Sequence, residues 1–140
     1  METVHGTTVA VAGAGVLLQG ASGSGKSDLA LRLIDRGAIL IADDRTILSR
    51  QGDQVVAQPP EPLWGILEVR GIGLIRVPTL ESIQLRLAVD LDMPPDRLPA
   101  PMFSTLSGVD IPLIRLSACE SSAPAKIRLA VGIGPDDIVR

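Results

Sequence analysis

Aromatic side chains are almost absent from this 140-residue sequence. It contains no tyrosine, and Trp64 and Phe103 are its only large aromatic residues. This scarcity argues against binding of bases by aromatic stacking, which is how many proteins hold single-stranded nucleic acid. Because 46% of the residues are hydrophobic all the same, we expect an aliphatic core. The length suits one domain over residues 1–140.

Cysteine, net charge and long apolar runs are scarce as well. Cys119 is the only cysteine, so the sequence supports neither an internal disulfide nor a cysteine-based metal site. The formal net charge is −3 without a basic cluster, which argues against nucleic acid or anionic membranes as partners. No apolar run reaches the ~18 residues of a membrane span, and the first residues lack the basic start of a signal peptide. We expect a soluble, cytoplasmic protein.

Glycine is concentrated in one run that implies a chemistry. This run fits G-x-x-x-x-G-K-[ST] and consists of Gly20, Ala21, Ser22, Gly23, Ser24, Gly25, Lys26 and Ser27. An apolar, strand-like stretch precedes it and a helix-like stretch follows, which is the context that a phosphate-binding loop requires. In such a loop backbone N–H groups surround the phosphates, Lys26 reaches the outer phosphates and Ser27 ligates Mg²⁺. The run predicts binding of ATP or another polyphosphate with Mg²⁺; a plain glycine-rich turn is the alternative.

Hydrophobic periodicity and turn residues predict a strand-rich chain with few helices, a sheet-dominated α/β fold. Gly37 is expected to end the helix that follows the phosphate loop. In the first half of the chain, the expected elements are a hairpin of Thr7–Val11 with Val16–Gln19, a helix from Lys26, a strand Ile39–Ala42, and a hairpin of Thr46–Ser49 with Val55–Gln58. In the second half, they are a loop and strand within Leu63–Ile75, a strand Ile83–Val89 with one core face, a loop Met93–Pro101 and a strand Ile111–Leu116. A last helix is expected through Val131, with Ser122 as N-cap and Pro124 in its first turn.

Acidic residues follow the expected strand Ile39–Ala42. Asp43 and Asp44 stand at its C-terminal end, where ligands gather in open α/β sheets, although capping of a turn would also explain them. A carboxylate can take the proton of a hydroxyl nucleophile, which makes Asp44 a candidate general base. Glu68 could join Ser27 on Mg²⁺ or be a solvated strand carboxylate. His5 is the only histidine, and the residues alone leave a structural or a catalytic role open.

The order of several motifs resembles the catalytic C-terminal domain of HPr kinase/phosphorylase. The resemblance covers essentially the whole chain and rests on His5-Gly6, Gly25-Lys26-Ser27, Ile41-Ala42-Asp43-Asp44, Leu67-Glu68-Val69-Arg70-Gly71-Ile72-Gly73 and Asp96-Arg97-Leu98. It implies a phosphate-loop core related to phosphoenolpyruvate carboxykinase. It also implies transfer of phosphate from ATP to a serine of the phosphocarrier protein HPr, with phosphorolysis as the reverse reaction, and assembly into a homo-oligomer, a hexamer. The resemblance is to a short form without the family's N-terminal domain.

The same resemblance assigns roles to individual residues. It implies that Asp44 is the base and that His5 orients or tunes it. Arg70 and Arg97 would stabilise charge on the transferring phosphoryl group, since a guanidinium matches phosphate geometry. Asp43 is a candidate for holding the metal or the loop.

Two departures from the family pattern bear on activity. Asp28 stands where the family commonly has glutamate. The run Cys119–Lys126 replaces an arginine-bearing loop that the family uses in dephosphorylation, so we expect weak reverse activity. A phosphate-loop kinase of a small hydroxylated metabolite and a non-catalytic nucleotide-sensing module are the competing hypotheses.

Overall fold

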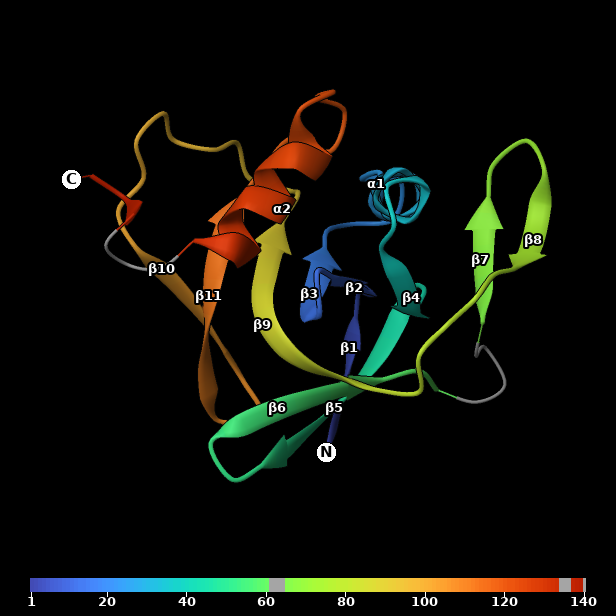
Figure 1. Ribbon diagram of the computed structural model, residues 1–140, viewed down its shortest axis with the longest axis horizontal. Coiled ribbons are helices and arrows are strands. Elements are labelled where there is room, and N and C mark those ends of the chain that lie inside the picture. The colour runs from blue at the N-terminus through green and yellow to red at the C-terminus, as the bar shows by residue number, and fades with distance from the viewer. Residues whose placement is uncertain (61–64, 134–136, 140) are drawn as a thin grey trace.

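A computed structural model describes residues 1–60, 65–133 and 137–139. The described part holds many short strands and two helices (Figure 1). In chain order they are β1 (Glu2–His5), β2 (Thr7–Val11), β3 (Ala14–Gln19), α1 (Lys26–Asp35), β4 (Ile39–Ala42), β5 (Arg45–Gln51), β6 (Gln54–Gln58), β7 (Ile66–Val69), β8 (Gly73–Arg76), β9 (Ile83–Asp90), β10 (Met102–Leu106), β11 (Val109–Arg115) and α2 (Ala123–Gly132).

The main sheet is organised around β9, which is strongly curved (Figure 1). The strand order is β1-β5-β6-β9-β3-β2-β4, and the β10–β11 hairpin joins it through a parallel pairing of β11 with β9. β3 also runs parallel to β9, so Gln19, Asp90 and Arg115 end three parallel strands in register. The loop that leaves β3 therefore starts beside the end of β9.

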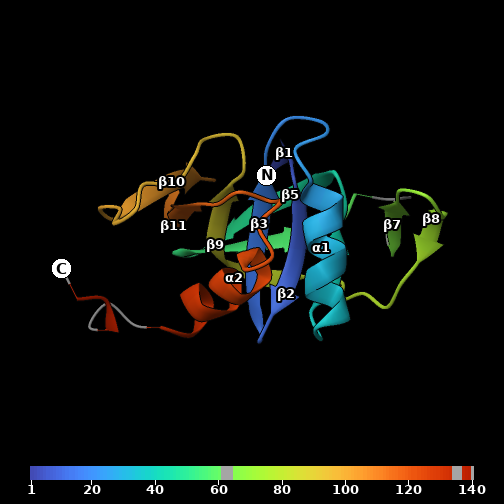
Figure 2. The ribbon, with the colours of Figure 1, turned by 90° about the horizontal axis from the view of Figure 1, so that it is seen from above.

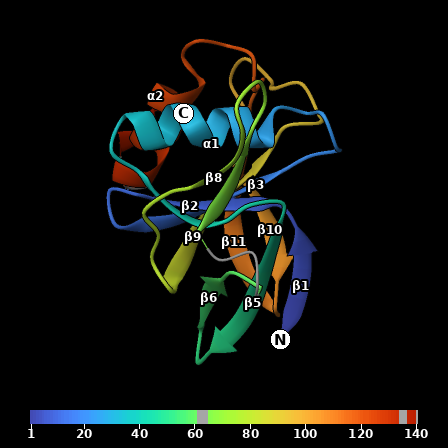
Figure 3. The ribbon, with the colours of Figure 1, turned by 90° about the vertical axis from the view of Figure 1, so that its right-hand side faces the viewer.

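Both faces of the central sheet are buried. Val16 and Leu18 of β3 pack in the cluster that contains Leu29 of α1 and Ile127 of α2, whereas Leu17 between them faces a second cluster formed by strands. Seen from above, the two helices lie over the same face of the sheet (Figure 2). The β7–β8 hairpin forms a separate two-stranded sheet on the outer side of α1 (Figure 3).

Most expected elements are confirmed, including both hairpins, the helix that ends before Gly37, and the strands corresponding to β4 and β11. Gly37 has φ 103, the left-handed conformation that favours glycine at a helix end. β1 and β10 were not expected, because both are short and their residues do not alternate between apolar and polar side chains. Leu63 and Trp64 of the expected loop and strand lie outside the described residues, and the rest of that stretch forms the β7–β8 hairpin.

One local expectation was wrong, and another was confirmed in position but without the capping hydrogen bond. β9 does not have a single core face, because Ala88 is fully buried along with its neighbours Leu87 and Val89. Leu87 and Val89 pack in the cluster that contains the helices, and Ala88 packs in the cluster on the other face, so this half of β9 is covered on both sides. Ser122 does occupy the N-cap position of α2, but its side chain makes no capping hydrogen bond.

The described core is aliphatic, as the composition predicted. Its largest fully buried side chains are leucine, isoleucine and valine, and Phe103 is 60% exposed. Trp64 lies outside the described residues. In the part of the chain that the structure describes, no helix has the length and apolar character needed to cross a membrane.

Candidate active site

The phosphate loop joins β3 to α1 through three glycines, Gly20, Gly23 and Gly25. Gly23 and Gly25 have φ values of 83 and 97, which other residues rarely adopt, and Gly25 is the N-cap of α1. A Cβ on Gly20 would lie 2.5 Å from the Ser24 Oγ, so a larger residue would push the loop apart. The Ser24 Oγ is buried and has no hydrogen-bond partner among the described residues. A closed backbone turn with an unsatisfied buried hydroxyl at a helix N-terminus fits a phosphate ligand.

Lys26 is folded against its own loop. The side chain is buried, with 6% of the residue exposed, and its Nζ donates to the carbonyl oxygens of Gly20 at 2.6 Å and Ala21 at 3.1 Å. The ammonium group is therefore already held among the backbone groups of the phosphate loop, and Lys26 also lines the cavity described below.

A three-residue turn over residues 43–45 points the side chains of the two neighbouring aspartates in different directions. The Arg45 N–H donates to the Asp43 carbonyl at 2.7 Å, and Asp44 at its centre has φ 66. Left-handed backbone is strained for a residue other than glycine, although aspartate tolerates it better than most. The turn sends Asp43 into the protein, where the residue is 8% exposed, while the Asp44 side chain remains 63% exposed.

The Asp43 carboxylate connects three elements. Its Oδ1 accepts from the Thr7 Oγ1 of β2 at 2.9 Å and from the Ser27 Oγ of α1 at 2.8 Å, and its Oδ2 accepts from the Glu68 N–H of β7 at 3.0 Å. Because the Ser27 hydroxyl donates its hydrogen bond to Asp43, the lone pairs of the Ser27 oxygen stay available for a cation. Asp43 thus positions the predicted metal ligand and attaches the β7–β8 hairpin to the loop.

This arrangement predicts a clear difference in stability between the two aspartates. Asp43→Ala should lower the free energy of unfolding by about 2–4 kcal/mol, because one buried and two partly buried donors lose their charged acceptor. Asp44→Ala is the matched control, and it should cost less than about 1 kcal/mol because Asp44 is exposed. Urea unfolding followed by circular dichroism measures both values. Equal costs for the two variants would contradict the assignment of Asp43 as the structural anchor.

Asp44 pairs with the only histidine. The His5 Nε2 lies 2.7 Å from the Asp44 Oδ1, and the side chains are 49% and 63% exposed. The backbone of Asp44 is held as well, because its N–H donates to the Thr7 Oγ1 at 3.1 Å and its carbonyl accepts from the Gly6 N–H at 2.8 Å. Within the described residues no donor contacts the other carboxylate oxygen of Asp44, which can therefore accept a proton.

A cavity of about 360 Å³ brings the predicted residues together. Lys26 and Ser27 lie on one side, Asp44 and Glu68 contribute carboxylates, and Arg70 adds a guanidinium. The described residues contain no group of three or more metal-ligating side chains. Ser27 and Glu68 alone would leave most ligands to water and phosphate oxygens, which is how Mg²⁺ is commonly bound beside a nucleotide.

Comparison with known proteins identifies the family. Residues 1–93 match the family described as "HPr Serine kinase C-terminal domain". The chain belongs to this family. The curated relative from Enterococcus faecalis, named HPr kinase/phosphorylase, is 43% identical over 128 residues, and the match covers 81% of this chain and 41% of that protein. The relative of the same name from Bordetella pertussis is 51% identical over 97 residues, and the match covers 64% of this chain and 32% of that protein. The chain thus spans less than half the length of these relatives.

A solved structure of the same family shares the fold. It is described as the Hpr(Ser) kinase/phosphatase from Coxiella burnetii, and it matches with a TM-score of 0.81 at 28% identity over 94% of each chain. The sheet-dominated α/β architecture with two helices is therefore that of an HPr kinase family member.

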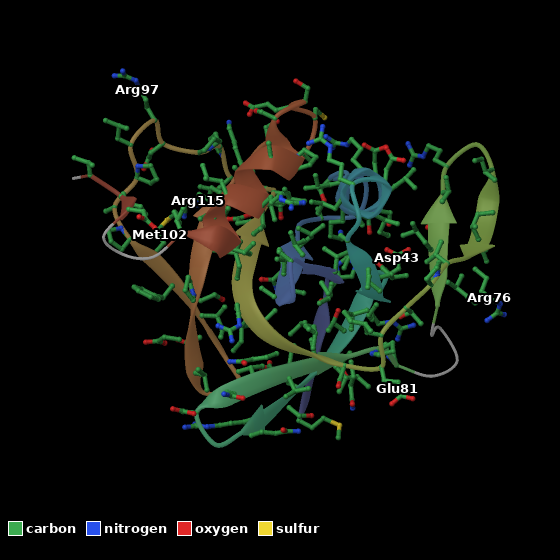
Figure 4. The ribbon with its side chains drawn as sticks, viewed as in Figure 1. Asp43, Arg76, Glu81, Arg97, Met102 and Arg115 are labelled. Carbon is green, nitrogen blue, oxygen red and sulfur yellow. The ribbon has the colours of Figure 1, made fainter. Side chains whose placement is uncertain are left out.

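Arg97 is the one predicted site residue of this HPr kinase family domain that the structure leaves away from the others. It lies in the exposed loop between β9 and β10 and does not line the cavity. Figure 4 shows it on the opposite side of the molecule from Asp43. Within one chain, the structure therefore does not bring Arg97 to the phosphate loop, and its role in charge stabilisation stays a prediction.

The run Cys119–Lys126, which departs from the family pattern, directly follows Ala118, and Ala118 packs beside the phosphate loop. A Cβ on Gly25 would lie 3.0 Å from the Ala118 Cβ, and Arg32 of α1 donates to the carbonyl oxygens of Ala118 and Glu120. Lys126 pairs with Glu120 at 2.8 Å, so its charge is largely matched within the run. Arg128 lines a different cavity of about 700 Å³ at the C-terminal end of α1, so it is not at the phosphate loop.

Sequence reasoning missed one residue at the loop, Asp92. Both of its carboxylate oxygens accept from the Ala21 N–H, at 2.9 and 3.1 Å. An acidic residue just after an expected strand was an available signal, the same one that singled out Asp43 and Asp44. This signal did not identify the hydrogen-bond partner of Asp92, because Asp92 and Ala21 are far apart in the sequence and are brought together by the pairing of β3 with β9.

Proposed function

We propose that this chain is an ATP-dependent protein-serine kinase that phosphorylates HPr. The observation that carries the proposal is the placement of Asp44 in the same cavity as the phosphate loop. Binding of phosphates and activation of a hydroxyl are the two requirements of phosphoryl transfer to serine. The names of the relatives, HPr kinase/phosphorylase and Hpr(Ser) kinase/phosphatase, support HPr as the acceptor.

One group of residues in the site binds ATP, and another takes the proton of the acceptor serine. The N–H groups of the loop and the Lys26 ammonium hold the outer phosphates of ATP, and Arg70 faces the same space. Asp44 takes the proton of the attacking serine hydroxyl with one oxygen, while His5 holds the other at 2.7 Å. Mg²⁺, held by Ser27 and Glu68, would neutralise phosphate charge when bound.

The exposure of the site favours a protein acceptor over a small metabolite. The Asp44 side chain is 63% exposed and lines a cavity that is too small to enclose a nucleotide and a second substrate. Ile72 and Leu74 of the adjoining hairpin are 74% and 73% exposed, which leaves an apolar surface beside the cavity. A folded protein can reach such a site with a serine on its surface.

Incubation with γ-labelled ATP, Mg²⁺ and purified HPr tests the proposal. The expected result is label on a serine of HPr, and HPr with that serine replaced by alanine is the control. Label on a small molecule from a metabolite extract would instead indicate a metabolite kinase. Binding of ATP without transfer to either acceptor would indicate a nucleotide-sensing module, and both outcomes would overturn the proposal.

The reaction should be faster in the kinase direction than in reverse. Phosphorolysis must bring phospho-HPr and inorganic phosphate together, and the run Cys119–Lys126 offers Lys126 already paired with Glu120. One missing charge-assisted hydrogen bond in the transition state lowers a rate about ten- to a hundredfold. Kinase turnover is compared with phosphate-dependent release of pyrophosphate from phospho-HPr. Equal rates in the two directions would contradict this expectation.

A further inference from the structure

Asp92 and Lys26 hold opposite ends of one peptide group. The N–H of the bond between Gly20 and Ala21 donates to both Asp92 carboxylate oxygens, at 2.9 and 3.1 Å, and the carbonyl of the same bond accepts from the Lys26 Nζ at 2.6 Å. A peptide placed between an anion at its N–H and a cation at its carbonyl is polarised in the direction that strengthens both hydrogen bonds. The carboxylate therefore favours the orientation in which this carbonyl receives the lysine.

The backbone around Asp92 is fixed by the end of the sheet. The Asp92 N–H donates to the Asp90 Oδ1 at 2.9 Å, and the Leu91 N–H donates to the Gln19 carbonyl at 2.9 Å. Asp90 itself faces Arg115, whose Nε lies 3.6 Å from its Oδ2. The carboxylate of Asp92 is thus delivered to the phosphate loop by the ordered ends of three parallel strands.

The phosphate loop is shaped to admit this carboxylate. A Cβ on Gly20 would lie 3.3 Å from the Asp92 Oδ1 as well as 2.5 Å from the Ser24 Oγ. The Ala21 carbonyl accepts from the Ser24 N–H at 3.0 Å and from Lys26 at 3.1 Å, so the residue that Asp92 holds also closes the turn. The glycine that begins the motif thus leaves room for Asp92 as well as for the turn.

We infer that Asp92 is a positioning residue for nucleotide binding, which acts on Lys26 through the peptide group between Gly20 and Ala21. The inference rests on the proposed function, because it assumes that the loop binds ATP. The carboxylate keeps the loop and the ammonium group in the arrangement that receives the phosphates, so less ordering is needed on binding. Asp92 does not line the cavity that contains Asp44, so it affects binding of ATP more than transfer.

The test compares Asp92→Ala, Asp92→Asn and the control Asp53→Ala, which removes the same charge from the exposed turn between β5 and β6. A non-hydrolysable ATP analogue with Mg²⁺ is titrated against each full chain, and kcat and KM for ATP are measured with HPr. Asp92→Ala should raise the Kd of the analogue and the KM about five- to tenfold with kcat within about twofold. Asp92→Asn, which retains an acceptor oxygen, should raise the Kd of the analogue and the KM only about two- to threefold.

A double-mutant cycle separates this role from a general structural one. If Asp92 acts through Lys26, Asp92→Ala should change the analogue's Kd less than about twofold in the Lys26→Ala background. Wild-type affinity of Asp92→Ala, tighter binding by Asp92→Asn, or a loss of kcat at unchanged KM would each overturn the inference. If Asp92→Ala fails to fold, Asp92→Asn alone decides by the same criteria. Failure of the wild-type chain to bind the analogue would instead count against the proposed function.

Discussion

Replacement of Asp44 by asparagine is expected to lower the rate of serine phosphorylation about 10²- to 10⁴-fold, the usual contribution of a positioned general base. The amide keeps the shape of the side chain but is not basic. ATP binding should remain close to wild type, because the hydrogen bonds of the phosphate loop and Lys26 do not involve Asp44. Single-turnover transfer to HPr measures the rate, and titration with the non-hydrolysable analogue measures affinity.

The neighbouring aspartate and the histidine provide the controls for this prediction. His5→Ala removes the 2.7 Å contact to Asp44 but leaves the carboxylate, so its loss of rate should be smaller. Asp43→Asn should act through stability and the position of Ser27. Full turnover by Asp44→Asn with none by Asp43→Asn would mean that the base is the other carboxylate of the pair.

Replacement of Lys26 by alanine is expected to abolish measurable transfer, with a loss of at least about 10²- to 10³-fold. The ammonium group would stabilise charge on the transferring phosphoryl group, and removal of one such preorganised group typically has an effect of this size. The fold should persist, because among the described residues the ammonium group of Lys26 donates only to carbonyl oxygens of its own loop. Transfer assays with HPr, together with thermal unfolding by circular dichroism, separate the two effects.

Lys26→Arg is the matched variant for this prediction. It keeps the positive charge, but the larger planar guanidinium does not fit the site between the Gly20 and Ala21 carbonyl oxygens. We expect it to lose most activity while retaining weak binding of the ATP analogue. Near-normal transfer by Lys26→Ala would rule out the assignment of residues 20–27 as the phosphate site.

Local sequence was sufficient to predict most of the elements and part of the site. The phosphate loop, the helix that follows it, and the strand before Asp43 and Asp44 were all predicted, because turns, caps and short apolar strands depend on neighbouring residues. The short strands β1 and β10 were missed, since their sequences do not alternate between apolar and polar residues. The expectation of one core face for β9 failed because helices cover one face of the sheet and other strands cover the opposite face, which the pattern of β9 alone does not reveal.

The sequence by itself determined the phosphate loop and its acidic neighbours, since glycine spacing, the lysine-serine pair and the strand before the aspartates are properties of adjacent residues. Only the tertiary structure decided which carboxylate is buried and which one stays exposed. A turn at Asp44 sends one carboxylate into the core and leaves the other beside His5, and the parallel pairing of β3 with β9 brings Asp92 to Ala21. These contacts join residues far apart in the chain, and their geometry depends on strand register and backbone conformation, which the local residue pattern did not reveal.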